Sequence, residues 1–179
     1  NSLRENYLFN STINGIEEAD LILLVGTNPR YEATILNSRI RKAYLQNKPK
    51  IISLNDVGEL TYPYKSLNGQ SETIKNIVEG NNEISQDILN SKKPMIVFGE
   101  TFLKLNSASY LFQTLKNFLI KNNKLTKDWN PINILSTDAS TVGNYDLDIM
   151  NETTDLFKNL NENKFEIVYL LGQDNLKFD

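Results

Sequence analysis

The chain has 179 residues, of which 40% are hydrophobic and 23% are charged, and its formal net charge is −3. These values are typical of a globular protein with one sizeable core, and they remove the electrostatic basis for nucleic-acid binding, which requires a basic surface. There is no cysteine and no histidine. This excludes iron–sulfur ligation by thiolates, disulfides, Cys nucleophiles and Ser-His-Asp triads, and it removes the commonest ligands of transition metals.

Five short apolar runs, rich in branched residues, alternate with helical patterns along the chain. Because the runs are continuous rather than alternating, both faces of each predicted strand should be buried, as in a parallel sheet. We therefore expect a single α/β domain over residues 1–179, with a mostly parallel, Rossmann-like sheet of five or more strands and helices on both faces. The five runs are Leu21–Val25, Ile51–Leu54, Met95–Phe98, Ile132–Leu135 and Ile167–Leu171.

The helix that follows the first strand is marked at both ends. Pro29 suits the first helical position, and Asn28 before it is biased toward the extended conformation that an N-cap needs. We expect this helix to end at Lys48, before Pro49. Its stripe facing the sheet should consist of Ala33, Leu36, Ile40 and Ala43, which recur at spacings of three and four.

Further apolar periodicity predicts the remaining helices and leaves two long loops. The loops, 56–70 and 136–144, are rich in turn-forming residues. Loops at the carboxyl ends of parallel strands line the ligand crevice of such folds, so a site, if the chain has one, is expected there. The predicted helices cover Ser71–Glu79, Glu83–Asn90, Asn106–Asn123 and a stretch that begins near Asn151.

Three predicted strands end in a glycine followed by polar residues, at Gly26, Gly99 and Gly172. The first turn reads Gly26-Thr27-Asn28-Pro29, which lacks the glycines of the dinucleotide fingerprint, and Pro29 has no amide to offer a phosphate. The Walker phosphate-binding pattern is absent as well. We therefore interpret this turn as a helix start and predict no catalytic residue, no cofactor-binding residue and no metal ligand.

Several segments carry a resemblance to a known family. The stretch Asn6–Ala43, continued in order by Lys92–Gly99, Asp128–Leu135 and Val168–Gly172, resembles the C-terminal domain of the large iron–sulfur subunit of respiratory complex I, the NADH:ubiquinone oxidoreductase. More distantly, Ala19–Pro29 is similar to the molybdopterin oxidoreductases, in which a G-x-N-P turn holds a pterin nucleotide. The resemblance covers nearly the whole chain.

The resemblance implies an architectural role rather than a catalytic one. In that family, the 2Fe-2S and 4Fe-4S clusters are bound in an N-terminal region that this chain does not contain, so none of their ligands maps onto it. Gly26, Thr27, Asn28 and Pro29 are then a vestigial turn. We expect a fragment of a larger subunit in the peripheral arm of complex I, which supports electron transfer from NADH to ubiquinone carried by other regions.

The same resemblance implies partners and a location. The partners would be other peripheral-arm subunits and the cluster-binding part of the same subunit, with no nucleic acid and no direct membrane span. The location would be the matrix side of the mitochondrial inner membrane, or the cytoplasmic face of a bacterial membrane. Two alternatives stay open: a molybdopterin oxidoreductase fragment that binds a pterin nucleotide at the carboxyl edge of the sheet, and a domain that binds an anion where Asn28 begins the helix.

Overall fold

The computed structural model describes residues 3–67, 69–80, 82–148, 156–167 and 169. The chain divides into two compact units, residues 1–142 and 143–179, which are described separately. Unit 1 holds the sheet and nearly all of the helices.

Unit 1 is built on a parallel five-stranded sheet in the order β3-β2-β1-β4-β5. The central strand β1 pairs with β2 in the register Leu21 to Lys50 and with β4 in the register Leu21 to Pro94. Each of the four strand pairs is parallel, so the predicted α/β class is confirmed. The strands are β1 (Leu21–Val25), β2 (Lys50–Ser53), β3 (Lys65–Ser66), β4 (Pro94–Phe98) and β5 (Ile132–Ile134).

Strands β1, β2, β4 and β5 were predicted within one residue of their bounds, whereas β3 was not predicted. Strand β3 lies in a segment that was predicted to be a loop, which was wrong for these two residues. Both residues are exposed and neither belongs to an apolar run. Strand β3 is held by backbone pairing with Ile52 and Ser53 rather than by side-chain burial, so no apolar pattern marks it. The run predicted as a fifth strand, 167–171, lies largely outside the described residues, and its described members Ile167 and Tyr169 belong to no strand.

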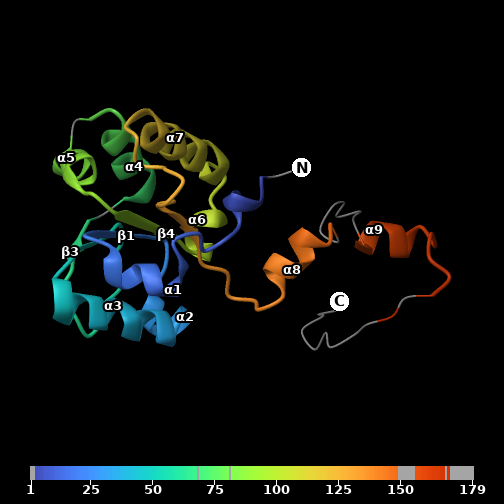
Figure 1. Cartoon of the computed structure of the whole chain (residues 1–179). Coiled ribbons are helices and arrows are strands. Elements are labelled where there is room, and N and C mark those ends of the chain that lie inside the picture. The colour runs from blue at the N-terminus through green and yellow to red at the C-terminus, as the bar shows by residue number, and fades with distance from the viewer. Residues whose placement is uncertain (1–2, 68, 81, 149–155, 168, 170–179) are drawn as a thin grey trace. The chain divides into compact units, whose positions relative to one another are not determined.

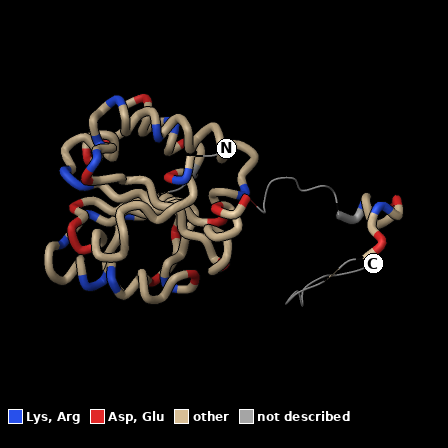
Figure 2. The backbone as a smooth tube through the Cα atoms, turned by 45° about the vertical axis from the view of Figure 1, so that its right-hand side comes forward, with Lys and Arg blue, Asp and Glu red and all other residues tan. Residues whose placement is uncertain are grey.

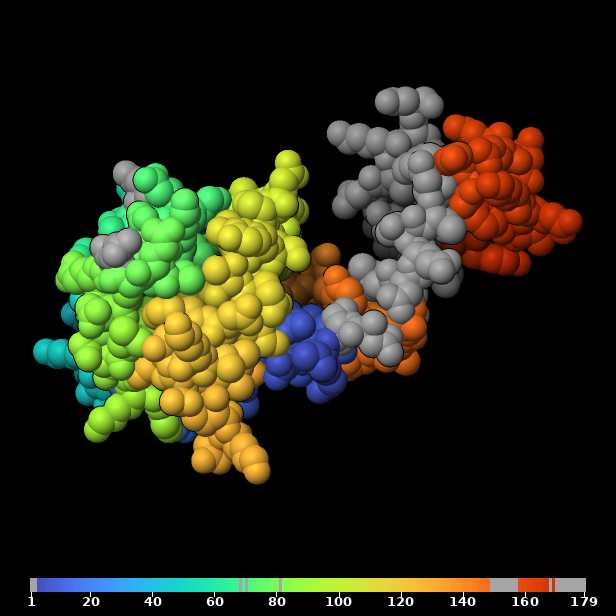
Figure 3. Space-filling view, turned by 90° about the horizontal axis from the view of Figure 1, so that it is seen from above, coloured from blue at the N-terminus to red at the C-terminus, as the bar shows by residue number. Residues whose placement is uncertain are grey.

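Helices cover both faces of the sheet (Figure 1). Helices α4, α5, α6 and α7 pack on one face, and α1 with the 3-10 turn η2 and helix α3 packs on the other. Seen from above, α4 and α7 lie side by side, as their mutual contacts require (Figure 3). The bounds are η1 (Arg4–Asn6), α1 (Thr12–Gly15), η2 (Ile16–Glu18), α2 (Pro29–Glu32), α3 (Thr34–Asn47), α4 (Gln70–Val78), α5 (Glu83–Asn90), α6 (Glu100–Leu103) and α7 (Ala108–Lys121).

The core has two layers, one on each side of the sheet. In β1, Leu21, Leu23 and Val25 face the α4–α7 layer, whereas Ile22 and Leu24 face the α3 layer. All five side chains are buried, so the continuous apolar run was a correct indication of burial on both faces. Charged residues of both signs are interspersed over both helical layers (Figure 2).

The helix after β1 was predicted as one element, and this was wrong at Ala33. That residue has φ −151° and ψ 74°, which separates the short helix α2 from α3. Two residues of the α2 region, Asn28 and Arg30, are hydrogen-bonded to the loop after β2, so α2 is held independently of α3. The predicted stripe is otherwise confirmed, because Leu36, Ile40 and Ala43 are buried.

The edge strand β5 is covered by the N-terminal segment of the chain. Phe9 forms an antiparallel bridge with Asn133, and the Ile134 amide donates to the Leu8 carbonyl at 3.0 Å. The buried Asn133 side chain accepts from the Ser11 amide at 2.8 Å. Exposed strand edges promote unwanted pairing, and these contacts close this one.

The helices near the unit boundary are short. Helix α8 (Thr141–Asp146) begins inside the segment predicted as a loop, so that prediction was wrong from Thr141, whose amide donates to the Asp138 carbonyl. In unit 2, helix α9 (Leu156–Asn161) corresponds to the helix predicted from Asn151, of which residues 151–155 lie outside the described residues. No described helix has the length and apolar character needed to cross a membrane.

Candidate functional site at the carboxyl edge of the sheet

The strand order reverses between β1 and β4, because the chain leaves β1 toward β2 on one side and leaves β4 toward β5 on the other. In doubly wound sheets, ligands bind in the crevice at the carboxyl ends of the strands at this reversal. In this chain the crevice would lie between the turn at Gly26 and the turn at Gly99. Both glycines were singled out by the sequence.

The two glycine turns are packed against each other. A Cβ atom on Gly26, whose φ is +63°, would lie 2.4 Å from the backbone nitrogen of Phe102, and one on Gly99 would lie 2.5 Å from the Gly26 carbonyl oxygen. Phe102 belongs to α6 and is fully buried, with its ring 4.9 Å from that of Phe98. The space that each glycine leaves open is therefore filled by the chain itself.

The polar groups of the first turn are also bonded internally. The Asn28 side chain accepts a hydrogen bond from the Arg30 amide at 3.2 Å, so its predicted role as N-cap is confirmed. The Glu32 carboxylate accepts from the Asn28 amide at 3.0 Å and from the Thr27 hydroxyl at 2.6 Å. A carboxylate of the same chain thus lies where an anionic ligand would meet these donors.

The loop after β2, where a site was expected, is held by its own side chains. The side-chain amide nitrogen of Asn28 donates to the Val57 carbonyl at 2.9 Å, which ties the first turn to this loop. Asp56 accepts from the Gly58 amide and from the Tyr64 hydroxyl, each at 3.0 Å. The hydrogen bond from the Gly58 amide, and to a smaller extent that from the Tyr64 hydroxyl, lowers the pKa of Asp56 below its ordinary value. This carboxylate therefore stays ionised and accepts both bonds.

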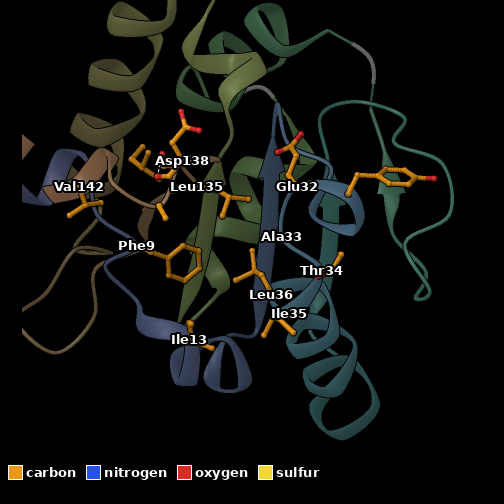
Figure 4. A pocket seen from close by; sticks show the side chains of 14 residues that line it. Phe9, Ile13, Glu32, Ala33, Thr34, Ile35, Leu36, Leu135, Asp138 and Val142 are labelled. Carbon is orange, nitrogen blue, oxygen red and sulfur yellow. Dashed lines mark hydrogen bonds between the residues drawn. The ribbon is translucent and has the colours of Figure 1, made fainter. Parts of the chain in front are cut away.

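The loop after β5 contributes to an open cleft beside α2 (Figure 4). The cleft has a volume of about 540 Å³ and is mostly apolar, with two carboxylates, those of Glu32 and Asp138, and no Lys or Arg among its lining residues. Strand β5, helices α1, α2 and α3, Phe9 of the N-terminal segment and Val142 of α8 supply the rest of its walls. The lining residues are Phe9, Ile13, Tyr31, Glu32, Ala33, Thr34, Ile35, Leu36, Ile134, Leu135, Ser136, Asp138, Ala139 and Val142.

These residues do not suit a phosphate-bearing nucleotide. Phosphate binding uses free backbone amides, Lys or Arg, whereas here the Asn28 amide is bonded to Glu32 and the cleft carries two acidic groups. The cation nearest the turn along the chain, Arg30, is bonded to the Glu59 carbonyl at 2.7 Å and to its carboxylate at 3.0 Å. Within the described part of the chain, no group of three or more Asp and Glu residues is arranged to hold a metal ion.

Comparison with known proteins places this architecture in a family. The family model of the molybdopterin oxidoreductases matches residues 1–178. The chain belongs to the molybdopterin oxidoreductase family. Within this family its sequence is similar to a subunit of one respiratory enzyme, as the individual relatives show.

The "NADH-ubiquinone oxidoreductase 75 kDa subunit" of Reclinomonas americana is 36% identical over 178 residues, which cover 98% of this chain and 26% of that protein. The mitochondrial 78 kDa subunits of Candida albicans and Neurospora crassa are 34% and 35% identical, over 97% and 96% of this chain and 23% of each relative. The chain therefore spans about a quarter of the length of these relatives.

The sequence identified the turn of this molybdopterin oxidoreductase domain but missed two residues that define it. Glu32 stands four residues after the N-cap, whereas the capping-box pattern has its acidic residue three residues after it, so no pattern marked it. Phe102 is one of eight phenylalanines, and only the strand order places it against Gly26. The glycine repeated at the ends of β1 and β4 was the one signal available.

Proposed function

We propose that this chain is a non-catalytic structural domain of the peripheral arm of respiratory complex I. In this proposal it supports the transfer of electrons from NADH to ubiquinone, which other regions and subunits carry. The names of the relatives, subunits of NADH-ubiquinone oxidoreductase, support the assignment to that enzyme. The absence of cysteine and histidine means that this chain supplies no thiolate or imidazole to an iron–sulfur cluster.

One observation carries the non-catalytic part of the proposal. The position that a ligand would take between the two strand ends is filled by Phe102 and by the turn itself, and the Glu32 carboxylate bonds the donors of that turn. Such a turn stabilises the start of α2 without a ligand. The partners in this proposal are other peripheral-arm subunits and the cluster-binding part of the same subunit, on the matrix side of the mitochondrial inner membrane or the cytoplasmic face of a bacterial one.

Native gel electrophoresis of solubilised membranes from the cells that make the protein tests the assignment to complex I. Mass spectrometry of the gel bands should find this chain together with iron–sulfur and NADH-oxidising subunits. Recovery of the chain only as a free monomer, with none of those subunits, contradicts the proposal.

The family match itself favours a second candidate, a fragment that retains a pterin nucleotide at the carboxyl edge of the sheet. The acidic cleft and the internally bonded turn oppose it, because an anionic nucleotide would face Glu32 and Asp138. Elemental analysis for molybdenum and tungsten, together with extraction of a fluorescent pterin, separates the two candidates. Stoichiometric metal and pterin would establish the second.

A further inference from the structure

The cleft beside α2 carries a group of large apolar side chains on its rim. Tyr31 is 79% exposed, Ile35 is 73% exposed and Ile13 is 52% exposed, and all three line the same hollow. Figure 4 shows Ile13 and Ile35 beside it. Single exposed apolar residues are ordinary on protein surfaces, but a contiguous group around a hollow marks an interaction site. Tyrosine in particular is enriched where proteins contact one another.

The charges of this cleft restrict its occupant. Asp138 is exposed at the start of the segment that leads to α8, and Glu32 is half-buried in α2. Each Glu32 oxygen accepts one hydrogen bond from the first turn, and a carboxylate oxygen has capacity for a second. Since no Lys or Arg lines the cleft, these two carboxylates are complementary to a cation brought by the occupant.

Other classes of occupant fit poorly. A second copy of the chain, related by twofold symmetry, would present the same carboxylates to this patch, and the like charges would repel each other. Anionic lipid surfaces and nucleic acids carry negative charge as well. A polypeptide segment that combines an apolar side chain with a Lys or Arg can pack against the apolar walls and pair with the two carboxylates.

We infer that the cleft formed by Ile13, Tyr31, Ile35 and Leu36 docks a segment of another polypeptide that has a large apolar side chain next to a Lys or Arg. The apolar side chain packs in the hollow, and the cation pairs with Asp138 and with the remaining acceptor capacity of Glu32. The inference rests on the proposed function, because the partner is expected among the other polypeptides of complex I.

Site-specific photo-crosslinking in the assembled complex tests the inference. A photo-reactive amino acid replaces Ile35 in the full chain, and in the matched control it replaces Leu45, which lies on the same helix α3 and is 67% exposed. After irradiation of isolated membranes, mass spectrometry identifies the crosslinked peptides. We expect the Ile35 probe to crosslink one defined polypeptide segment, with a large apolar residue beside a Lys or Arg, and the Leu45 probe not to reach it.

A charge reversal provides a second readout. With the Ile35 probe in place, Asp138→Lys should lower the crosslink yield about two- to fivefold, the effect expected of an exposed ion pair. The exposed Asp128, in the segment before β5, gives the matched control Asp128→Lys, which should leave the yield unchanged.

The outcomes separate this inference from the proposed function. If native gels place the chain outside complex I, the proposed function fails. If the chain is in the complex but Ile35 crosslinks no more than Leu45, or crosslinks lipid, another copy of this chain or a segment without a cation, then the docking inference alone is overturned.

Discussion

The two ends of the sheet in unit 1 are closed in different ways. At the amino end, the Asp20 carboxylate accepts from the amides of Lys92 and Lys93 at 2.7 and 3.0 Å, and the Trp129 indole donates to the Pro94 carbonyl at 2.7 Å. At the carboxyl end, the contact between β1 and β4 is made by two glycines whose neighbours leave no room for a side chain. Pairing of polar groups closes the first end, and tight backbone contact closes the second.

This difference assigns a different sensitivity to each region. Loss of a charge should destabilise the amino end, and an added side chain should destabilise the glycine contact at the carboxyl end. Substitution of the exposed apolar residues of the cleft should weaken partner binding and leave stability nearly unchanged. A doubly wound sheet keeps its carboxyl end for ligands. Here the space between the ends of β1 and β4 is filled by the chain itself, and the apolar residues of the cleft beside α2 remain exposed. Both features are consistent with the proposal that this domain binds protein instead of a nucleotide.

The largest expected effect is that of Gly26→Ala. The new methyl group would meet the backbone of α6, and the left-handed φ adds strain, so the free energy of unfolding should fall by about 2–5 kcal/mol. Gly80→Ala is the matched control, because Gly80 has φ +77° with open space around it, and only strain of about 1–2 kcal/mol is expected. Urea denaturation of both variants measures the difference. Equal losses would contradict the tight contact.

A smaller effect is expected from Glu32→Ala, which leaves the Thr27 hydroxyl and the Asn28 amide without their acceptor. The free energy of unfolding should fall by about 1–3 kcal/mol, because Thr27 is buried and Asn28 is half-buried, so solvent does not fully replace the lost bonds. In the control, Glu72→Ala removes an exposed carboxylate from the first turn of α4 and should change stability by less than about 0.5 kcal/mol. A Glu32 variant as stable as this control would show that the internal carboxylate does not hold the turn.

The contribution of Asp20 to the stability of the amino end should depend on pH. Partial loss of contact with water raises its pKa, but the hydrogen bonds that Ser91, Lys92 and Lys93 donate to it outweigh that effect, so the folded pKa lies below its ordinary value. Its contribution to stability is therefore present above the unfolded pKa of about 4 and is lost as the pH falls through the folded value.

Asp20→Asn should accordingly cost about 1 kcal/mol at pH 7, a modest figure because the side chain is exposed, and the cost should shrink below about pH 4. Thermal unfolding across pH 2 to 7, with Asp128→Asn as the control, gives the measurement. A cost that stays constant with pH would mean that the charge of Asp20 does not close this end.

The smallest folding effect is expected at the rim. Ile35→Asp and Leu45→Asp replace similarly exposed residues of α3, and each should change the free energy of unfolding by less than about 0.5 kcal/mol. A loss of more than about 1 kcal/mol for Ile35→Asp alone would indicate that the rim belongs to the core of the chain. Chemical denaturation of the pair is sufficient to decide.

The sequence predicted those parts of the fold that depend on periodic burial. The strands β1, β2, β4 and β5 and the helices α4, α5 and α7 each follow an apolar pattern and were correctly placed. Strand β3 was missed because backbone pairing alone holds it, and the break at Ala33 was missed because it depends on contacts with a distant loop. At the site, the role of Asn28 followed from its neighbour Pro29. Glu32 was missed because it stands one residue beyond the capping-box spacing, and Phe102 because it contacts Gly26 only through the tertiary fold.

The chain itself fills the position that a nucleotide would take between the ends of β1 and β4. Native mass spectrometry of the full chain, purified from the cells that make it without denaturation, tests this most directly. The predicted result is the mass of the polypeptide alone, or that of its complexes with other subunits, without a bound pterin nucleotide. A stoichiometric additional mass that matches a pterin nucleotide, with or without molybdenum or tungsten, would contradict the account.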